Sequence, residues 1–395
     1  MISLGIERLE IDWGKNHSFT DHSKLFLPND VCDIPYYYAD DVIEMKPGLS
    51  RTLGAIARRL DLLGYSAATL PGKYAELVDA MPDYYDDVPL KFEQFAAIMK
   101  AVDLSKAFKT LEEGDYDLGE YISRYVFEEP EIKKLLPPGI TINQDAGTFF
   151  ENFDPYLTLR LLAMNPMNSD RLVQWRYADV VEGGWAERDE VVKPLADEAK
   201  ILIVTEGSSD SFIIQRTLAA LYPDIADFFH FVDMEENYPF TGAGSLQRFC
   251  QGLASMKIEH KVLVVFDNDV AGIEKFVEVR RLKRPGTMHV CRLPDHPDFS
   301  SVLTAGPNGL SKADINGAAV AIECFLDLRP MEKRPHLIRW TSYNRDLGRY
   351  QGEIEGKELL VSLFKKADLP NGSYDSSRLT FLIEHLLKEW IDHAR

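Results

Sequence analysis

Two patterns of apolar and polar residues divide the chain near residue 198. Before it, residues 2–12 alternate apolar and polar side chains, which is typical of a half-buried strand. From residue 51 the apolar residues recur at intervals of three and four, which predicts helices at 51–63, 72–80, 91–102, 117–126 and 155–164. The pattern therefore predicts a mixed, mainly helical α+β domain over residues 1–198 with a β element at its start.

After residue 199, short continuous apolar runs alternate with helical periods. The runs are 200–206, 228–233, 261–267 and 287–293, and the helical periods are 208–221, 245–256 and 271–282. Strands that alternate with helices are typical of a parallel sheet, and continuous apolar strands suit a sheet covered on both faces. We expect an α/β domain over 199–305, with a mainly parallel sheet and helices on both faces. A short helical C-terminal segment, 306–395, is expected to pack on it.

Acidic residues stand at the ends of two of these apolar runs. Glu206 ends the first run, and Asp267 ends the third. Asp269 lies two residues later, so an extended backbone points both aspartates the same way. Asp210 stands where the helix after Gly207 should begin. Functional groups of parallel sheets collect at the carboxyl edge of the strands, where all four acids are expected.

These four acids predict a site for a hard divalent cation. Clustered carboxylates repel one another unless a cation neutralises them. Oxygen ligands with no Cys or His nearby favour Mg²⁺ or Mn²⁺ over zinc, and such ions polarise phosphates and activate water. The alternative for each acid alone is a helix cap, a role that Asp fills readily. Their occurrence together at this spacing favours the metal site.

Charge and composition narrow the classes of partner. The 63 acidic residues outnumber the 44 basic ones, which gives a net charge of −19. Because nucleic-acid binding usually needs a basic surface, this charge argues against a broad, non-specific duplex binder. We expect a cytoplasmic protein without membrane contact, since we find no signal peptide and no apolar run of about eighteen residues. The four cysteines form no CxxC pair, which argues against a zinc knuckle and a disulfide framework.

The order of these motifs resembles the Toprim domain, the catalytic module of primases, topoisomerases, overcoming-lysogenization-defect nucleases and small ribonucleases. The resemblance covers residues 199–293 and rests on an apolar strand followed by EGxxD and a later apolar strand followed by DxDxxG, with a glycine-rich turn at 242–244 between them. It implies a Rossmann-like Toprim fold that holds one or two Mg²⁺ or Mn²⁺ ions. Glu206 would be a metal-linked general acid or base, Asp267 and Asp269 metal ligands, and Asp210 a further ligand.

Residues outside this domain extend the resemblance. Segments 12–16 and 21–26, with 304–309, 315–326 and 339–345, are similar to bacterial HEPN- and Toprim-associated conflict-system proteins, which implies a role in prokaryotic antiphage defence. Glu323, in an apolar, helix-like stretch, would complete the metal site as a late glutamate does in related nucleases. The alternative is an ion pair with Arg339 or a solvated edge. Lys357 would stabilise transition-state charge, or be an ordinary surface lysine.

One basic run could contact nucleic-acid phosphates although the net charge of the chain is negative. It consists of Arg280, Arg281, Lys283 and Arg284, and the alternative is a solvated loop edge.

The function that these features predict is metal-dependent cleavage of DNA or RNA phosphodiester bonds. A primase-like nucleotidyl transferase is one alternative, but no Cys/His cluster supports it. A non-catalytic Toprim subunit that binds nucleic acid or a partner is the other, and the intact set of four acids argues against it. We find no P-loop motif, so any ATPase or sensor would be a separately encoded subunit. Assembly with further copies of this chain stays open.

Overall fold

A computed structural model describes residues 3–12, 20–38, 42–80, 90–106, 118–135, 149–150, 153–232, 242–332 and 337–393. The chain divides into two compact units, Met1–Leu195 and Ala196–Ala394. None of the helices within the described ranges is both long and apolar enough to cross a membrane.

The first unit contains an antiparallel five-stranded sheet in the order β2-β1-β5-β4-β3. Its strands are β1 (Ser3–Ile6), β2 (Leu9–Asp12), β3 (Val31–Tyr37), β4 (Ile43–Thr52) and β5 (Leu172–Arg176). The prediction of one strand over 2–12 was wrong, because Glu7 has a φ of 53° and the chain turns there into a hairpin. The sheet is also larger than the single β element predicted. In β3, Pro35 and several exposed positions hide the alternation that marks a strand.

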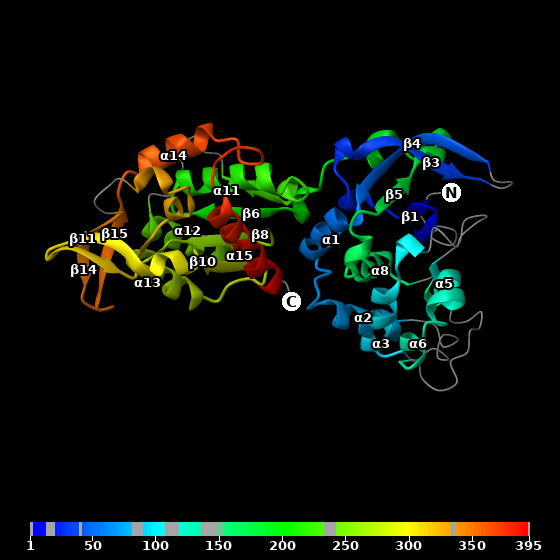
Figure 1. Ribbon diagram of the computed structural model, residues 1–395, viewed down its shortest axis with the longest axis horizontal. Coiled ribbons are helices and arrows are strands. Elements are labelled where there is room, and N and C mark those ends of the chain that lie inside the picture. Colours follow the sequence, from blue (N-terminus) through cyan, green and yellow to red (C-terminus); the bar gives the residue numbers. More distant parts are fainter. Residues whose placement is uncertain are drawn as a thin grey trace. The chain divides into compact units, whose positions relative to one another are not determined.

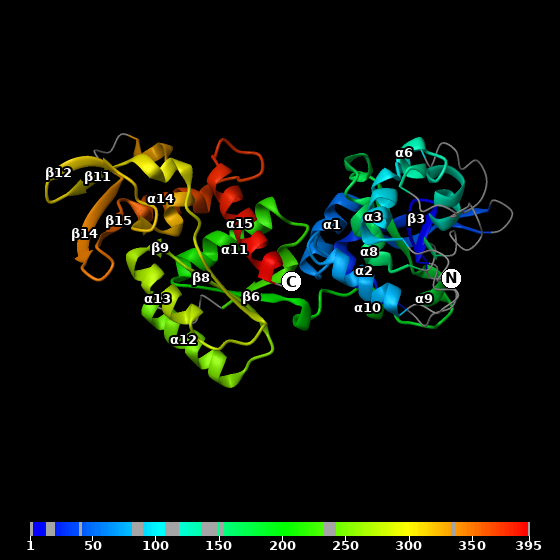
Figure 2. The ribbon, with the colours of Figure 1, turned by 90° about the horizontal axis from the view of Figure 1, so that it is seen from below.

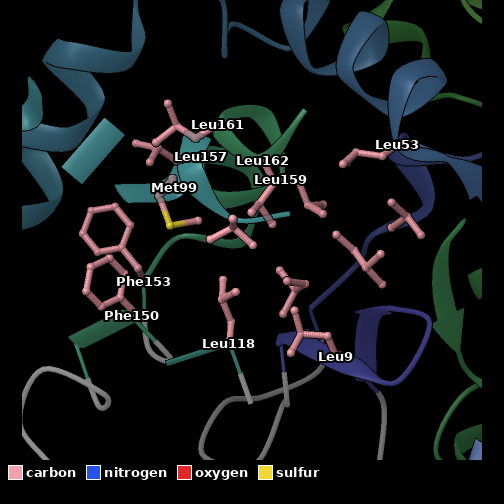
Figure 3. Packing of buried hydrophobic residues seen from close by; sticks show 14 of the residues in the cluster. Leu9, Leu53, Met99, Leu118, Phe150, Phe153, Leu157, Leu159, Leu161 and Leu162 are labelled. Atoms are coloured by element: carbon pink, nitrogen blue, oxygen red, sulfur yellow. The ribbon is translucent and has the colours of Figure 1, made fainter. Parts of the chain in front are cut away.

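Helices make up the rest of this unit, and the five predicted ones are confirmed. They are α1 (Leu53–Leu62), α2 (Leu70–Asp79), α3 (Phe92–Ala101), α5 (Leu118–Tyr121) with a π-helical continuation (Ile122–Val126), and α8 (Pro155–Leu162). Shorter helices are α6 (Pro130–Lys133), α9 (Ala178–Glu182) and α10 (Arg188–Val191). Asp154 caps α8 by accepting a hydrogen bond from the backbone N–H of Leu157 at 2.7 Å. Leucines of α8 then pack against Met99 and Phe153 in the core (Figure 3).

The second unit is built on a four-stranded parallel sheet in the order β10-β8-β6-β7. Its strands are β6 (Ile201–Thr205), β7 (Phe229–Phe231), β8 (Lys261–Phe266) and β10 (Met288–Arg292). The sequence-based prediction of a parallel sheet is confirmed.

Helices cover both faces of this sheet. They are α11 (Ser208–Leu221), α12 (Ala243–Met256), α13 (Val270–Arg280) and α15 (Ser377–His393). Ile203 and Leu263 face α11 and α15, whereas Val204 and Val264 face α12 and α13. Figure 2 shows these two helix pairs above and below the strands. Alternate side chains of each strand are thus buried on opposite faces, which explains the continuous apolar runs.

The C-terminal part of this unit was predicted to be helical, and that prediction was wrong. Besides α14 (Lys357–Lys366) and α15, it contributes β11 (Val302–Gly306), β12 (Gly309–Ala313), β14 (Ile338–Asn344) and β15 (Arg349–Ile354). These strands form a sheet in the order β12-β11-β14-β15 that lies beside α13 (Figure 1). Because β12 and much of β14 are exposed, their sequences lack a clear apolar pattern.

The segment 315–326 is likewise not a helix. It forms β13 (Ala319–Val320), which pairs with β9 (Asn268–Asp269), and one 3₁₀ turn (Ile322–Phe325). Short apolar runs cannot be assigned to strand or helix by periodicity, and this run was too short to decide.

Candidate metal centre

Two acids meet where adjacent parallel strands end. β6 and β8 run side by side with Thr205 opposite Val265, so the residues that follow them lie at the same edge of the sheet. Glu206 and Asp267 are those residues. The backbone N–H of Asp267 donates a 2.8 Å hydrogen bond to Oε1 of Glu206, which fixes the glutamate side chain at the end of β8.

Gly272 allows this close approach. A Cβ atom at this position would lie 2.4 Å from the carbonyl oxygen of Asp267 and 2.9 Å from Oε1 of Glu206. Both distances are too short for any side chain, and one of the neighbours is backbone. The glycine of the DxDxxG motif is therefore needed for α13 to start against the acids.

The other two predicted acids lie at helix starts. Asp210, in the first turn of α11, accepts a 2.9 Å hydrogen bond from the backbone N–H of Gly207. Asp269 caps α13 by accepting from the N–H of Gly272 at 2.7 Å. Asp210 and Asp269 therefore bond to backbone N–H groups at helix starts, as helix-capping acids do. They also lie at the same edge of the parallel sheet as Glu206 and Asp267.

The acids of this edge, Glu206, Asp210, Asp267, Asp269 and Glu323, are called here the carboxylate cluster. Burial, followed by repulsion from Asp269 and Asp210, raises the pKa of Glu206 to about 8, although backbone hydrogen bonds oppose this shift. Burial and the charge of Glu323 raise the pKa of Asp210 to about 7. Carboxyl groups with such pKa values are costly to ionise without a cation nearby.

Asp267 has the most acidic surroundings of the cluster. Burial raises its pKa well above the usual range, and repulsion from Asp210, Glu206, Asp269 and Glu323 raises it further. The pKa of Asp269 is raised as well, mainly by burial, although its hydrogen bonds oppose the shift. Four carboxylates therefore act on Asp267 at once.

Glu323 and Lys357 come to the same place from distant parts of the chain. Glu323 lies on the 3₁₀ turn after β13 and is only 6% exposed. The suggested ion pair with Arg339 is wrong, because Arg339 pairs with Glu355 at 2.5 Å. Lys357 begins α14 with an exposed side chain, and its positive charge lowers the pKa of Asp210.

Sequence reasoning missed two further groups. Gln351 of β15 donates from Nε2 to Oδ2 of Asp269 at 2.5 Å and accepts from the N–H of Ala271 at 3.1 Å. Asn268, fully buried between the two aspartates, donates to Asp295 at 2.7 Å and accepts from Arg292. Asn268 stands inside the DxD motif and could have been singled out. Gln351 carried no signal, because β15 was not predicted.

The basic run is not part of this cluster. Arg280 ends α13, whose start is capped by Asp269, and a helix of this length is about 16 Å long. Arg281 and Lys283 are exposed, and Arg284 is half-buried. The structure thus places the basic run at the opposite end of α13 from the acids.

The carboxylate oxygens of the cluster are the right ligands for a hard cation, but they do not converge on one point. All five side chains are carboxylates, the ligands that Mg²⁺ and Mn²⁺ prefer. Among the residues that the structure describes, no three His, Cys, Asp or Glu side chains are arranged to hold a metal ion. Hydrogen bonds to Gly207 and Gly272 turn Asp210 and Asp269 toward helix ends. Cation binding would require these side chains to rotate.

Comparisons with known proteins concern the other unit. No curated protein and no solved structure gives a significant match to the chain. A family model described as HEPN/Toprim N-terminal domain 1 matches residues 1–199, half of the chain. The chain therefore belongs to the HEPN/Toprim N-terminal domain 1 family.

Proposed function

We propose that the protein is a Toprim nuclease that cleaves phosphodiester bonds of DNA or RNA with one or two Mg²⁺ or Mn²⁺ ions. The observation that carries the proposal is the pairing of Glu206 with Asp267 at the ends of adjacent parallel strands. Asp269, two residues beyond Asp267, stands at the start of the next helix. A sheet with helices on both faces supports the Toprim fold.

The chain offers a residue for each part of the reaction. The carboxylate cluster would hold the cation, which when bound supplies charge stabilisation and lowers the pKa of a water molecule. Glu206, whose pKa burial raises while no cation is bound, would exchange a proton with the reacting groups as a metal-linked general acid or base. Lys357, whose charge reaches Asp210, would stabilise the extra negative charge of the phosphate in the transition state.

The family supports a setting for this activity. Membership of a HEPN/Toprim family favours an effector nuclease of prokaryotic antiphage defence. A separately encoded ATPase or sensor subunit, or assembly of several copies of this chain, would then control when it cuts.

One observation favours a second function, that of a non-catalytic nucleic-acid- or partner-binding subunit. The cluster includes acids already engaged as helix caps, and the described side chains do not form a ready-made metal site.

Metal-dependent cleavage distinguishes the two functions. The purified chain would be incubated with single- and double-stranded DNA and RNA in Mg²⁺, in Mn²⁺ and in EDTA. Cleavage that needs the metal and is absent in Asp267→Asn supports the nuclease. The matched control is Asp346→Asn, which removes the same charge from an exposed position in this unit. Binding without cleavage by the wild-type chain in either metal would favour the non-catalytic subunit.

A further inference from the structure

A groove runs along β10, the edge strand of the parallel sheet. It has a volume of about 740 Å³ and lies between α13 and α15, with residues of β10 as its floor. Charged and aromatic side chains from α13, β10, α15 and the loops beside β10 line it. We call this feature the β10 groove. All of its lining belongs to the second unit.

The β10 groove has unpaired positive charge. Its two acids already have partners, since Asp295 pairs with Arg292 at 3.2 Å and Glu389 with His289 at 3.0 Å. Within the described part of the chain, Arg280 has no carboxylate partner and stacks on Phe276 at 5.5 Å.

Arg284 has a buried donor nitrogen without a partner among the described residues. This atom is Nη1, and burial together with the charge of Arg280 lowers the pKa of Arg284. A buried cationic donor without a partner is costly, and a bound anion would remove that cost.

The histidines of the groove are not arranged as a metal site. Nε2 of His385 bonds the carbonyl oxygen of Arg292 at 3.2 Å, and Nε2 of His393 bonds that of Gly286 at 2.8 Å. Nε2 of His289 is already on Glu389. A ring nitrogen that bonds a carbonyl oxygen is the donor, so the second nitrogen of a neutral ring is an acceptor and offers no N–H to an anion. The groove's donors for an anion are therefore Arg280 and Arg284, and no metal-binding group of three side chains occurs in the described ranges.

The groove also adjoins the carboxylate cluster. Arg292 and Asp295 line its one end, and both bond to Asn268, which stands between Asp267 and Asp269. From there the groove follows β10 toward Arg284 and His393 at the other end. Phe276 and Phe381, the latter 42% exposed, provide apolar ring surfaces along it.

We propose that the β10 groove binds a single strand of nucleic acid, with Arg280 and Arg284 on its phosphates and unpaired bases against Phe276 and Phe381. This ligand class rests on the proposed function. Arginine with a neighbouring aromatic ring is the pairing that binds phosphates and stacks bases in single-strand grooves. A groove of this volume accepts part of one strand. The strand would continue from the groove to the carboxylate cluster.

The test compares two pairs of charge removals on one segment. Arg280→Gln with Arg284→Gln removes charge from the groove, whereas Arg281→Gln with Lys283→Gln removes equal charge from exposed residues outside its lining. Binding of short fluorescein-labelled single-stranded DNA and RNA to the full chain is measured by anisotropy in EDTA. The groove pair should weaken binding about tenfold and reduce the salt slope by about 1.4, and the control pair should change the affinity less than about twofold.

Several outcomes would overturn the proposal. Equal losses in the two pairs would mean diffuse attraction, and no loss would mean that the strand binds elsewhere. Adenosine monophosphate that binds as tightly as the oligonucleotides would assign the groove to free nucleotides. Since EDTA prevents metal-dependent cleavage, an inactive nuclease with the expected binding refutes the proposed function but leaves the groove proposal intact.

A measurement on the wild-type chain covers the case in which the groove pair does not fold, which melting curves would show. Oligonucleotides that carry 5-iodouracil are photo-crosslinked to the chain, and the modified peptides are identified by mass spectrometry. Crosslinks should fall on Phe276, Phe381 or the groove histidines. Crosslinks confined to other surfaces would refute the proposal.

Discussion

Two carboxylates, Asp179 in the first unit and Asp267 in the second, have opposite electrostatic surroundings. In the first unit, Asp179 accepts hydrogen bonds from Lys46 and Tyr38, both at 2.8 Å. Burial alone would raise its pKa, but these bonds and the charge of Lys46 hold the pKa of Asp179 below its usual value. In the second unit, Asp267 is surrounded by four other acids, and its pKa is raised.

This difference shows where a ligand is to be expected. A carboxylate that is matched by a base within the chain is part of the fold, whereas a group of unmatched carboxylates costs stability unless something outside the chain compensates it. The second unit has unmatched charge of both signs, acids at the cluster and arginines in the β10 groove. A phosphate group with a bound metal cation would compensate both, because the cation neutralises the acids and the phosphate neutralises the arginines.

The largest expected effect is on catalysis. Asp267→Asn should reduce the metal-dependent cleavage rate by about a thousandfold or more, because a bound cation supplies several kcal/mol of transition-state stabilisation. Initial rates in Mn²⁺ are the measurement. Asp179→Asn, the same change in the first unit, should leave the rate within about twofold. If Asp267→Asn cuts at the wild-type rate, the carboxylate cluster is not the catalytic metal site.

The next effect concerns Gln351, a positioning residue. Gln351→Ala removes the hydrogen bond that holds Asp269, and loss of such a support typically weakens metal binding about tenfold or more. Calorimetric titration with Mn²⁺ measures this affinity. Asn344→Ala on the neighbouring strand is the control, because its amide accepts from the N–H of Leu347 at 3.0 Å and lies 3.5 Å from Glu274, which is not part of the carboxylate cluster. Unchanged Mn²⁺ affinity would show that Asp269 needs no support from β15.

The comparison between the units also predicts stability changes of opposite sign. Without metal, Asp267→Asn should raise the melting temperature of its unit by roughly 3–6 °C, about 1–2 kcal/mol, because repulsion is relieved. Asp179→Asn should destabilise its unit by roughly 1 kcal/mol, because an ion pair is lost. Added Mn²⁺ should stabilise the wild-type chain more than Asp267→Asn. If both variants raise the melting temperature, or both lower it, the surroundings of Asp267 and Asp179 do not differ in the way described.

A further effect is the dependence of stability on pH. Glu206 and Asp210 have folded-state pKa values of about 8 and 7, above their ordinary values of 4.5 and 3.8. The folded state therefore binds more protons than the unfolded state between about pH 4 and 8, so stability falls as pH rises through this window. Melting in EDTA from about pH 5 to 8 should show this decline for the second unit. A flat profile would mean that the acids ionise freely.

The parallel sheet and two of its acids could be predicted because the signals are local. Each strand is buried on both faces, so each is a continuous apolar run, and Glu206 and Asp267 follow directly in sequence. The strands of the second sheet could not be predicted in this way. β12 is almost wholly exposed, so its sequence has no pattern that burial would impose.

Contacts between distant segments were the other limit. Gln351 reaches Asp269 across 82 residues, and Arg292 reaches Asn268 across 24. No spacing rule connects such positions before the fold is known. The place of Arg284 could not be predicted either. In the sequence it belongs to one basic run with Arg281, and only the fold places Arg284 in the groove and Arg281 outside it.

The position of α15 has a consequence for the order of folding during synthesis. Ile383 and Leu386 of this helix cover Ile203 and Leu263 of the sheet, which are made more than a hundred residues earlier. As the chain leaves the ribosome, the first unit can complete its core while that face of the sheet is still bare. A domain with an open apolar face is prone to bind chaperones or to aggregate. The second unit cannot finish folding before residues 377–393 have emerged, so newly made chains would gain any activity of the carboxylate cluster only after α15 has been made.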